Sequence, residues 1–273
     1  MKMRLFLMPV LFAAFSATAQ AHEVWLEPDR WEVESEAQFG AQLLNGEGFK
    51  GSELSWNPRV ILRAEKWQGD GGVRLVGRFG DTPALSTTAG QDGLLTLIYQ
   101  SSPNTVEYKD YEKFAQFVRE KGLDTVLAEH KARKLPTAPI KEAFSRYVKS
   151  LVAVGAGQGA DAPRGLEIEI VALNNPYTVD ADQMMRFQVF YKSEVLAGNL
   201  VTLFERTPEG QVTLKTQVSD DKGIAAFKTM AGNTYLVDSV VMRVPAPALV
   251  AYTKGAVWES LWASLTFRVP DSQ

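Results

Sequence analysis

The sequence predicts a mainly β protein, with an N-terminal β-rich domain that contains inserted helices and a C-terminal Greek-key β-sandwich of the immunoglobulin or transthyretin type. Short runs of alternating apolar and polar residues recur between glycine- and aspartate-rich turns, above all after residue 165. The chain of 273 residues also contains six tryptophans, fourteen phenylalanines and eight tyrosines. Aromatic residues at this level favour strands over a helical bundle.

The first 21 residues have the features of a secretory signal. Lys2 and Arg4 give a positive start, residues 5–17 form a short apolar core, and Ala19-Gln20-Ala21 is a small-x-small cleavage site. Cleavage after Ala21 leaves a mature chain of 252 residues, the 273 less the first 21, and changes the formal net charge from −3 to −5 because Lys2 and Arg4 are lost. We therefore expect a periplasmic protein.

The composition of the mature chain excludes several classes of protein. There is no cysteine, so the chain has neither disulfides nor thiolate metal ligands. No basic cluster suggests binding to nucleic acid. No later stretch is long and apolar enough to be a transmembrane helix, so any membrane contact is expected to go through a partner.

The first domain, residues 22–154, is expected to begin with strands and continue with helices. Alternation predicts a half-buried strand at 31–39, and further strands are expected at 60–67, 73–79 and 94–101, separated by turns at 69–72 and 90–93. Apolar residues at helical spacing then predict helices at 110–121, which Gly122 ends, from Asp124 to about Lys134, and from Ile140 to about Ser150. The helical segment thus covers residues 110–150.

Residues 155–165, Gly-Ala-Gly-Gln-Gly-Ala-Asp-Ala-Pro-Arg-Gly, are expected to form a flexible linker, and we place the domain boundary there. The second domain, residues 166–273, consists mostly of strand patterns with a tight turn at 219–223. The expected strands are 166–172, 185–191, 200–206, 211–218, 224–228, 234–244 and 261–269.

His22 is the leading candidate for a metal ligand. Cleavage after Ala21 would place an imidazole and a free α-amino group on one residue, and two such nitrogens can chelate nickel, copper, zinc or cobalt near neutral pH. Glu23, Glu27 or Asp29 could add an oxygen ligand. Two alternatives stay open: the histidine stands there by chance, or cleavage after Ala19 leaves Gln20 as the first residue.

His130 is the other histidine of the chain. It lies four residues after Val126 and three after Leu127 on the expected second helix, and so shares their apolar face. It could serve as a second metal ligand. The favoured alternative is a buried histidine bonded to a backbone carbonyl.

Catalytic signatures are absent from the sequence, so we do not expect an enzyme. There is no Gly-x-Ser-x-Gly, His-Glu-x-x-His or phosphate-binding glycine loop. A copper oxygenase with an N-terminal histidine brace would need a second imidazole, and only His130 is available. The methionines at 184, 185, 230 and 242 suit core packing better than Cu(I) binding.

Several motifs, in order along nearly the whole mature chain, resemble the DUF4198 family, whose members are also described as NikM-like, nickel-uptake-associated periplasmic proteins. Each motif is weak alone, and together they are fairly specific. They are residues 21–28 (AHEVWLEP), Phe114 to Asp124, 144–151 (FSRYVKSL), 166–168, 175–177, 219–223 (SDDKG) and 258–267 (WESLWASLTF).

The resemblance implies a two-part, β-rich exported protein that takes part in the uptake of transition metals, often beside an inner-membrane transporter. Members often have a histidine near the position of Val240 to Met242, which this chain lacks. The expected site is therefore His22 with His130 or a nearby carboxylate, Glu23 or Glu27. We expect a periplasmic protein that binds and delivers a transition metal; the alternative is a non-metal binding module for a glycan, a peptide or an envelope partner.

Overall fold

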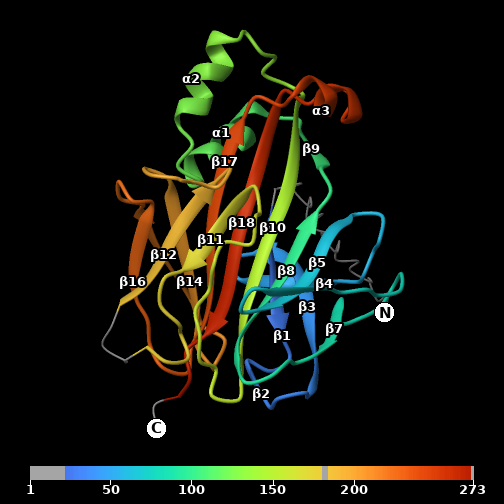
Figure 1. Ribbon diagram of the computed structural model, residues 1–273. Coiled ribbons are helices and arrows are strands. Elements are labelled where there is room, and N and C mark those ends of the chain that lie inside the picture. The colour runs from blue at the N-terminus through green and yellow to red at the C-terminus, as the bar shows by residue number, and fades with distance from the viewer. Residues whose placement is uncertain (1–21, 180–183, 272–273) are drawn as a thin grey trace, which may run out of the picture.

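The computed structural model describes residues 22–179 and 184–271, and the expected signal sequence lies outside them (Figure 1). The protein is mainly β, as predicted, with three short helices in the described ranges. These helices are α1 (Tyr111–Glu120), α2 (Thr125–Ala132) and α3 (Pro247–Tyr252), and they gather at one end of the molecule.

The described strands form three sheets. Sheet A contains β1 (Glu23–Pro28), β3 (Gln38–Glu47), β4 (Lys50–Leu54) and β7 (Leu85–Thr88). Sheet B contains, in order, β15 (Val212–Val218), β14 (Leu200–Arg206), β17 (Thr234–Arg243), β18 (Trp258–Arg268), β10 (Ile140–Val154), β8 (Gly93–Ser101), β5 (Ile61–Gln68) and β6 (Gly71–Arg74), with β2 (Glu32–Val33) and β9 (Asn104–Tyr108) also paired to β10. Sheet C contains β11 (Ile168–Ala172), β12 (Met184–Tyr191), β13 (Glu194–Val195) and β16 (Ile224–Lys228).

Sheet B is the central layer, covered on one face by sheet C and on the other by sheet A and the helices. Leu261 and Phe267 of β18 pack in one core cluster with Phe187 of β12. On the opposite face of β18, Ser264 Oγ donates to the Val24 carbonyl of β1 at 2.7 Å. The alternation of side chains along a strand therefore gives β18 two buried faces.

The strand β10 corrects the prediction of a third helix at 140–150. It pairs in parallel with β18, from Glu142 opposite Trp258 to Ser150 opposite Thr266, and the two strands run side by side through the middle of the molecule (Figure 1). Both faces of β10 are buried, so its apolar residues follow no clean period of two. Their chance spacing at 144, 147, 148 and 151 imitates a helix.

The other elements agree with the sequence to different degrees. The first two predicted helices are confirmed, and the Asp110 side chain caps α1 by accepting from the Glu112 amide at 2.9 Å. All seven strands expected after residue 165 are present. The strand expected at 31–39 is interrupted by a turn, where Glu36 has a φ of 59°, and the one expected at 73–79 ends at Arg74. Several elements were not predicted, namely the helix α3 and the strands β1, β4, β7, β9 and β13.

The segment 155–165, which the sequence predicts to be a flexible linker, contains no helix or strand and contacts the sheets. The buried Lys149 Nζ of β10 lies 2.8 Å from Asp161 Oδ1 in this segment and 3.1 Å from Glu169 Oε1 in β11. The strands β10 and β18 come from opposite sides of the segment and are neighbours in sheet B. The two predicted domains thus share their central sheet, and their independent folding stays a prediction.

The helices α1 and α2 cover one end of sheet B. Phe114 and Phe117 of α1 and Val126 of α2 pack against Trp258 and Trp262 of β18 in one buried cluster. Across residues 22–179 and 184–271, no helix combines the length and the apolar character that crossing a membrane would require.

We predict that Lys149→Met strongly destabilises the fold. The substitution leaves the buried carboxylates of Asp161 and Glu169 without their shared cation, which we expect to lower the free energy of unfolding by roughly 3–5 kcal/mol. Urea denaturation measures the change. The control is Arg119→Met, which breaks the exposed pair with Glu112 and should have little effect. A loss of less than about 1 kcal/mol for Lys149→Met would contradict the assignment.

Candidate functional site

His22 lies at the start of β1, where two cavities meet. It directly precedes Glu23, the first residue of the strand, and its side chain is partly exposed and lines both cavities. The strand β1 pairs with β3 from Glu23 opposite Gly46 to Pro28 opposite Ala41, and also packs against β10 and β18. The pairing of β1 therefore positions His22, which directly precedes the strand.

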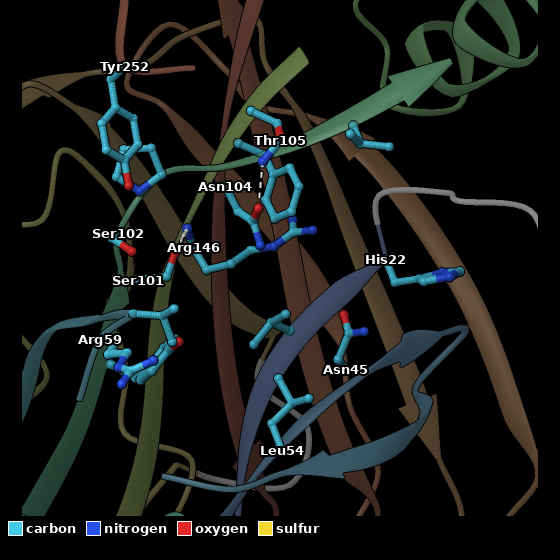
Figure 2. A pocket seen from close by; sticks show the side chains of 16 residues that line it. His22, Asn45, Leu54, Arg59, Ser101, Ser102, Asn104, Thr105, Arg146 and Tyr252 are labelled. Carbon is cyan, nitrogen blue, oxygen red and sulfur yellow. Dashed lines mark hydrogen bonds between the residues drawn. The ribbon is translucent and has the colours of Figure 1, made fainter. Parts of the chain in front are cut away.

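The larger cavity has a volume of about 560 Å³, and we call it the arginine cavity. Its lining includes His22, Asn45, Arg59, Asn104 and Arg146, and no Asp or Glu among the described residues. Figure 2 shows the Arg146 side chain extending from β10 toward the centre of the lining residues, with Arg59 and His22 toward opposite sides of the view. This cavity therefore combines positive charge with amide and hydroxyl groups.

The second cavity has a volume of about 360 Å³ and the opposite character, and we call it the carboxylate cavity. His22, Glu23, Glu47, Glu120 and Lys121 are among its lining residues. The three glutamates come from β1, β3 and α1. One side of His22 thus faces oxygen donors, which are ligands for a cation, and the other faces arginines.

Two lining residues of the carboxylate cavity, Glu23 and Lys121, belong to a buried ion cluster. Lys121 Nζ lies 2.8 Å from Glu23 Oε1 and 2.8 Å from Asp238 Oδ2, and 4.6 Å from the centre of the Trp262 ring. Burial raises the pKa of Asp238. Burial acts to lower the pKa of Lys121, but the attraction of Asp238 and Glu23 outweighs it and raises that pKa above its usual value. Lys121 therefore stays protonated and cannot act as a ligand.

One of the two carboxylate oxygens of Glu23 has no hydrogen-bond partner among the described residues. Its Oε1 accepts from Lys121, while Oε2 is buried without a hydrogen-bond partner in the described part of the chain. A buried carboxylate oxygen with no donor is costly, and a cation or a hydrogen-bond donor would satisfy it.

Arg146 is a buried cation without hydrogen bonds to two of its nitrogens. It is 5% exposed, and its guanidinium carbon lies 4.2 Å from the Trp262 ring centre and 4.9 Å from that of Phe144. Its Nε and Nη1 have no partner within residues 22–179 and 184–271. Burial lowers its pKa to about 10 although Asp238, Glu142 and Glu23 attract it. The side chain stays charged at neutral pH and offers unpaired N–H groups beside the arginine cavity.

Glu142 is the fully buried carboxyl nearest in sequence to Arg146. It accepts hydrogen bonds from Tyr108 Oη at 3.0 Å and from Ser260 Oγ. Burial raises its pKa from 4.5 to about 7, although both hydrogen bonds and Arg146 act to lower it. The charge beside the site therefore changes near neutral pH.

The structure places His130, expected as a second ligand, inside the hydrophobic cluster of the helices. It is 2% exposed, its Nδ1 accepts from Trp258 Nε1 at 3.0 Å, and its Nε2 lies 3.1 Å from the Pro136 carbonyl. Both ring nitrogens are engaged, which is the arrangement of a structural histidine. His130 is absent from the described lining of the two cavities that contain His22.

Glu27, the other expected oxygen ligand, is engaged elsewhere. Its Oε2 accepts from Trp25 Nε1 at 3.1 Å, and its Oε1 pairs with Arg206. Across the described ranges, no group of three or more His, Asp or Glu side chains is already arranged to hold a metal ion. Of the four expected ligands, the structure brings together only His22 and Glu23.

Sequence reasoning missed most residues of the site. Arg146 and Glu142 were assigned to a helix, and Glu47, Glu120 and Lys121 were not considered as site residues. The charged residues at 142, 146 and 149 within an otherwise apolar run were the available signal, because such residues in a buried strand need internal partners.

Comparisons with known proteins bear on the family alone. The DUF4198 family, described as a domain of unknown function, matches residues 19–243. No curated protein matches the chain. Among solved structures, the chain is similar to a crystal structure of a tetra-tandem repeat in the extending region of a large adhesion protein, at 11% sequence identity and a TM-score of 0.21, over 91% of this chain and 50% of that one. The chain spans half the length of that structure, and a TM-score this low carries no argument about fold or function.

We predict that Glu142→Gln gains stability relative to the wild type as the pH rises. Because the pKa of Glu142 is raised in the fold, its neutral form contributes stability that is full below the unfolded pKa and is lost as the pH rises through about 7. The amide cannot ionise, so the difference in unfolding free energy should grow between pH 5 and 8, by up to roughly 3 kcal/mol.

Urea denaturation at each pH measures this difference. The control is Glu107→Gln on the exposed side of β9, which should show no such trend. Parallel curves for Glu142→Gln and the wild type would show that Glu142 is ionised throughout this range.

Proposed function

The chain belongs to the DUF4198 family, and we propose that it is an exported, periplasmic protein that holds a divalent transition-metal ion at His22 and delivers it to a transport partner. The observation that carries the proposal is that His22 and Glu23, which has an unsatisfied carboxylate oxygen, line the same cavity. Both residues line the carboxylate cavity, and Glu23 Oε2 finds no donor in the described structure.

The donor set at this position suits a first-row transition metal. The imidazole of His22 and the α-amino group created by cleavage after Ala21 supply two nitrogens from one residue. Glu23, Glu47 and Glu120 supply oxygens at the same cavity. Mixed nitrogen and oxygen ligands suit nickel, copper, zinc and cobalt, and the chain contains no cysteine to select a softer ion.

The position of the site fits a protein that loads and unloads its ion. His22 is partly exposed, and the groups around it come from β1, β3 and α1, which are held by pairing and by the Lys121 ion cluster. The ligands would be preorganised on one side and open on the other. Such a site allows exchange with a partner, whereas a structural metal site is closed by four protein ligands.

We predict that the mature protein binds nickel, copper, zinc or cobalt ions at one site and that His22→Ala weakens this binding by about tenfold or more. Isothermal titration calorimetry on protein that begins at residue 22 measures the affinity. A second variant keeps Ala21 in front of His22, so that the imidazole is present but its amine is not. We expect the same weakening there, because the chelate is broken.

The control for this test is Glu27→Gln, which changes an acidic residue of β1 whose oxygens pair with Arg206 and Trp25. It should bind the ions as the wild type does. Equal metal affinity in the wild type, in His22→Ala and in the variant that keeps Ala21 would contradict the proposal. Binding of a sugar or a peptide, unaffected by removal of metal, would then favour a non-metal binding module.

A further inference from the structure

We propose that the arginine cavity binds a small organic carboxylate, whose carboxylate group is held by the buried guanidinium of Arg146. This site is separate from the metal ligands on the carboxylate side of His22. Its argument rests on unpaired donors, on charge and on the shape of the cavity.

The donors are the first observation. Arg146 is 5% exposed, yet its Nε and Nη1 make no hydrogen bond to any residue that the structure describes. Leaving buried N–H groups of a cation unpaired costs more than leaving neutral ones unpaired. A planar guanidinium matches a carboxylate through two parallel hydrogen bonds from one edge, either Nε with Nη2 or Nη1 with Nη2. One carboxylate at the cavity would therefore satisfy one of the two unpaired nitrogens.

The structure also fixes the orientation of this guanidinium. The rings of Phe144 and Trp262 lie 4.9 and 4.2 Å from its carbon atom, and the backbone amide of Arg146 donates to Ser101 Oγ at 3.0 Å. Aromatic contacts stabilise the cation without using its N–H groups. The arginine is therefore preorganised, which lowers the entropy cost of binding.

The charge of the cavity is the second observation. The formal net charge of the chain is −3, but the described residues that line this cavity include Arg59 and Arg146 and no carboxylate. The three carboxyl groups that attract Arg146 already have other partners: Asp238 and Glu23 pair with Lys121, and Glu142 accepts from Tyr108 and Ser260. The cavity thus concentrates positive charge in an acidic protein, which favours an anion.

The walls indicate an organic anion. Val24, Leu54, Val60, Val106 and Phe144 provide apolar surface for a carbon skeleton. Asn45, Asn104, Ser102 and Thr105 provide polar groups that can bind hydroxyl or further carboxylate oxygens. A volume of about 560 Å³ lies within the range of small-molecule sites. Inorganic phosphate would satisfy the guanidinium but would leave these apolar walls without a partner.

His22 gives this inference a consequence that rests on the proposed function. Because His22 lines both cavities, an ion held there lies at the rim of the arginine cavity. A carboxylate bound to Arg146 could supply the remaining ligands of that ion. The cargo would then be a metal ion together with its carboxylate chelator.

The test is calorimetry on the full mature protein, freed of metal on a chelating resin, with acetate, succinate and citrate as probes. Inorganic phosphate and glucose are the comparison ligands. We expect at least one carboxylate to bind at one site, to raise the melting temperature, and to bind more tightly than either comparison ligand. Arg146→Lys keeps the charge but loses the fork of donors, and should weaken binding by about tenfold or more.

A second pair of variants keeps the test valid if the substitution of the buried Arg146 prevents folding. Arg59→Gln changes an exposed arginine of the cavity and should weaken carboxylate binding, whereas Arg78→Gln changes an exposed arginine outside it and should not. No binding of any of the three carboxylates overturns the proposal. Wild-type affinity in both Arg146→Lys and Arg59→Gln, or phosphate binding as tight as that of the best carboxylate, also overturns it.

Titrations with and without nickel distinguish the proposed carboxylate site from the proposed metal site. With nickel present, His22→Ala should abolish any gain in carboxylate affinity that the ion produces, and the metal-free affinity of the same variant is the baseline for this comparison. Carboxylate binding without any nickel binding supports the arginine cavity and contradicts the metal site. Nickel binding without carboxylate binding supports the metal site and contradicts the arginine cavity.

Discussion

The parallel pairing of β10 with β18 is the constraint on which the rest of the structure depends. The pair lies in the central sheet, and sheet A with the helices covers one face while sheet C covers the other. Three of the four charged side chains of β10, all but Lys141, are therefore directed into a packed layer. Glu142, Arg146 and Lys149 must each find partners inside the protein, because charges this deep are stable only when they are compensated.

The three residues meet this requirement in different ways. Lys149 is paired with Asp161 and Glu169 and joins the segment 155–165 to the sheets. Glu142 accepts two hydrogen bonds and titrates near neutral pH. Arg146 contacts aromatic rings, and two of its nitrogens have no hydrogen-bond partner in the described chain. This arginine is therefore the group that we propose to bind a carboxylate ligand. The proposed carboxylate site rests on Arg146, which among these three residues is the one with unpartnered side-chain nitrogens in the described chain.

The fold was predictable from the sequence where one face of a strand is buried and the other is not. The strand 224–228 was located correctly because its residues alternate between buried and less buried positions. The strand 140–154 was missed because both of its faces are buried, and only its distant partner β18 makes it a strand. Local patterns report local exposure, and a parallel pairing across more than a hundred residues leaves no local trace.

The site was predictable only where one residue carries the chemistry. His22 stands out by its place after the predicted cleavage site, and in the structure it lines the carboxylate cavity together with Glu23. Glu47 and Glu120 meet them only through folding, since they come from β3 and α1. The expectation for His130 illustrates the same limit, because its partners Trp258 and Pro136 are set by tertiary packing.

Anomalous diffraction from crystals of the mature chain grown with nickel tests the central claim most directly. The account predicts a single strong peak about 2 Å from a ring nitrogen and from the amine of His22, with a glutamate oxygen of the carboxylate cavity beside it. A well-ordered His22 with no peak, or a peak at ligands elsewhere in the chain, would contradict it.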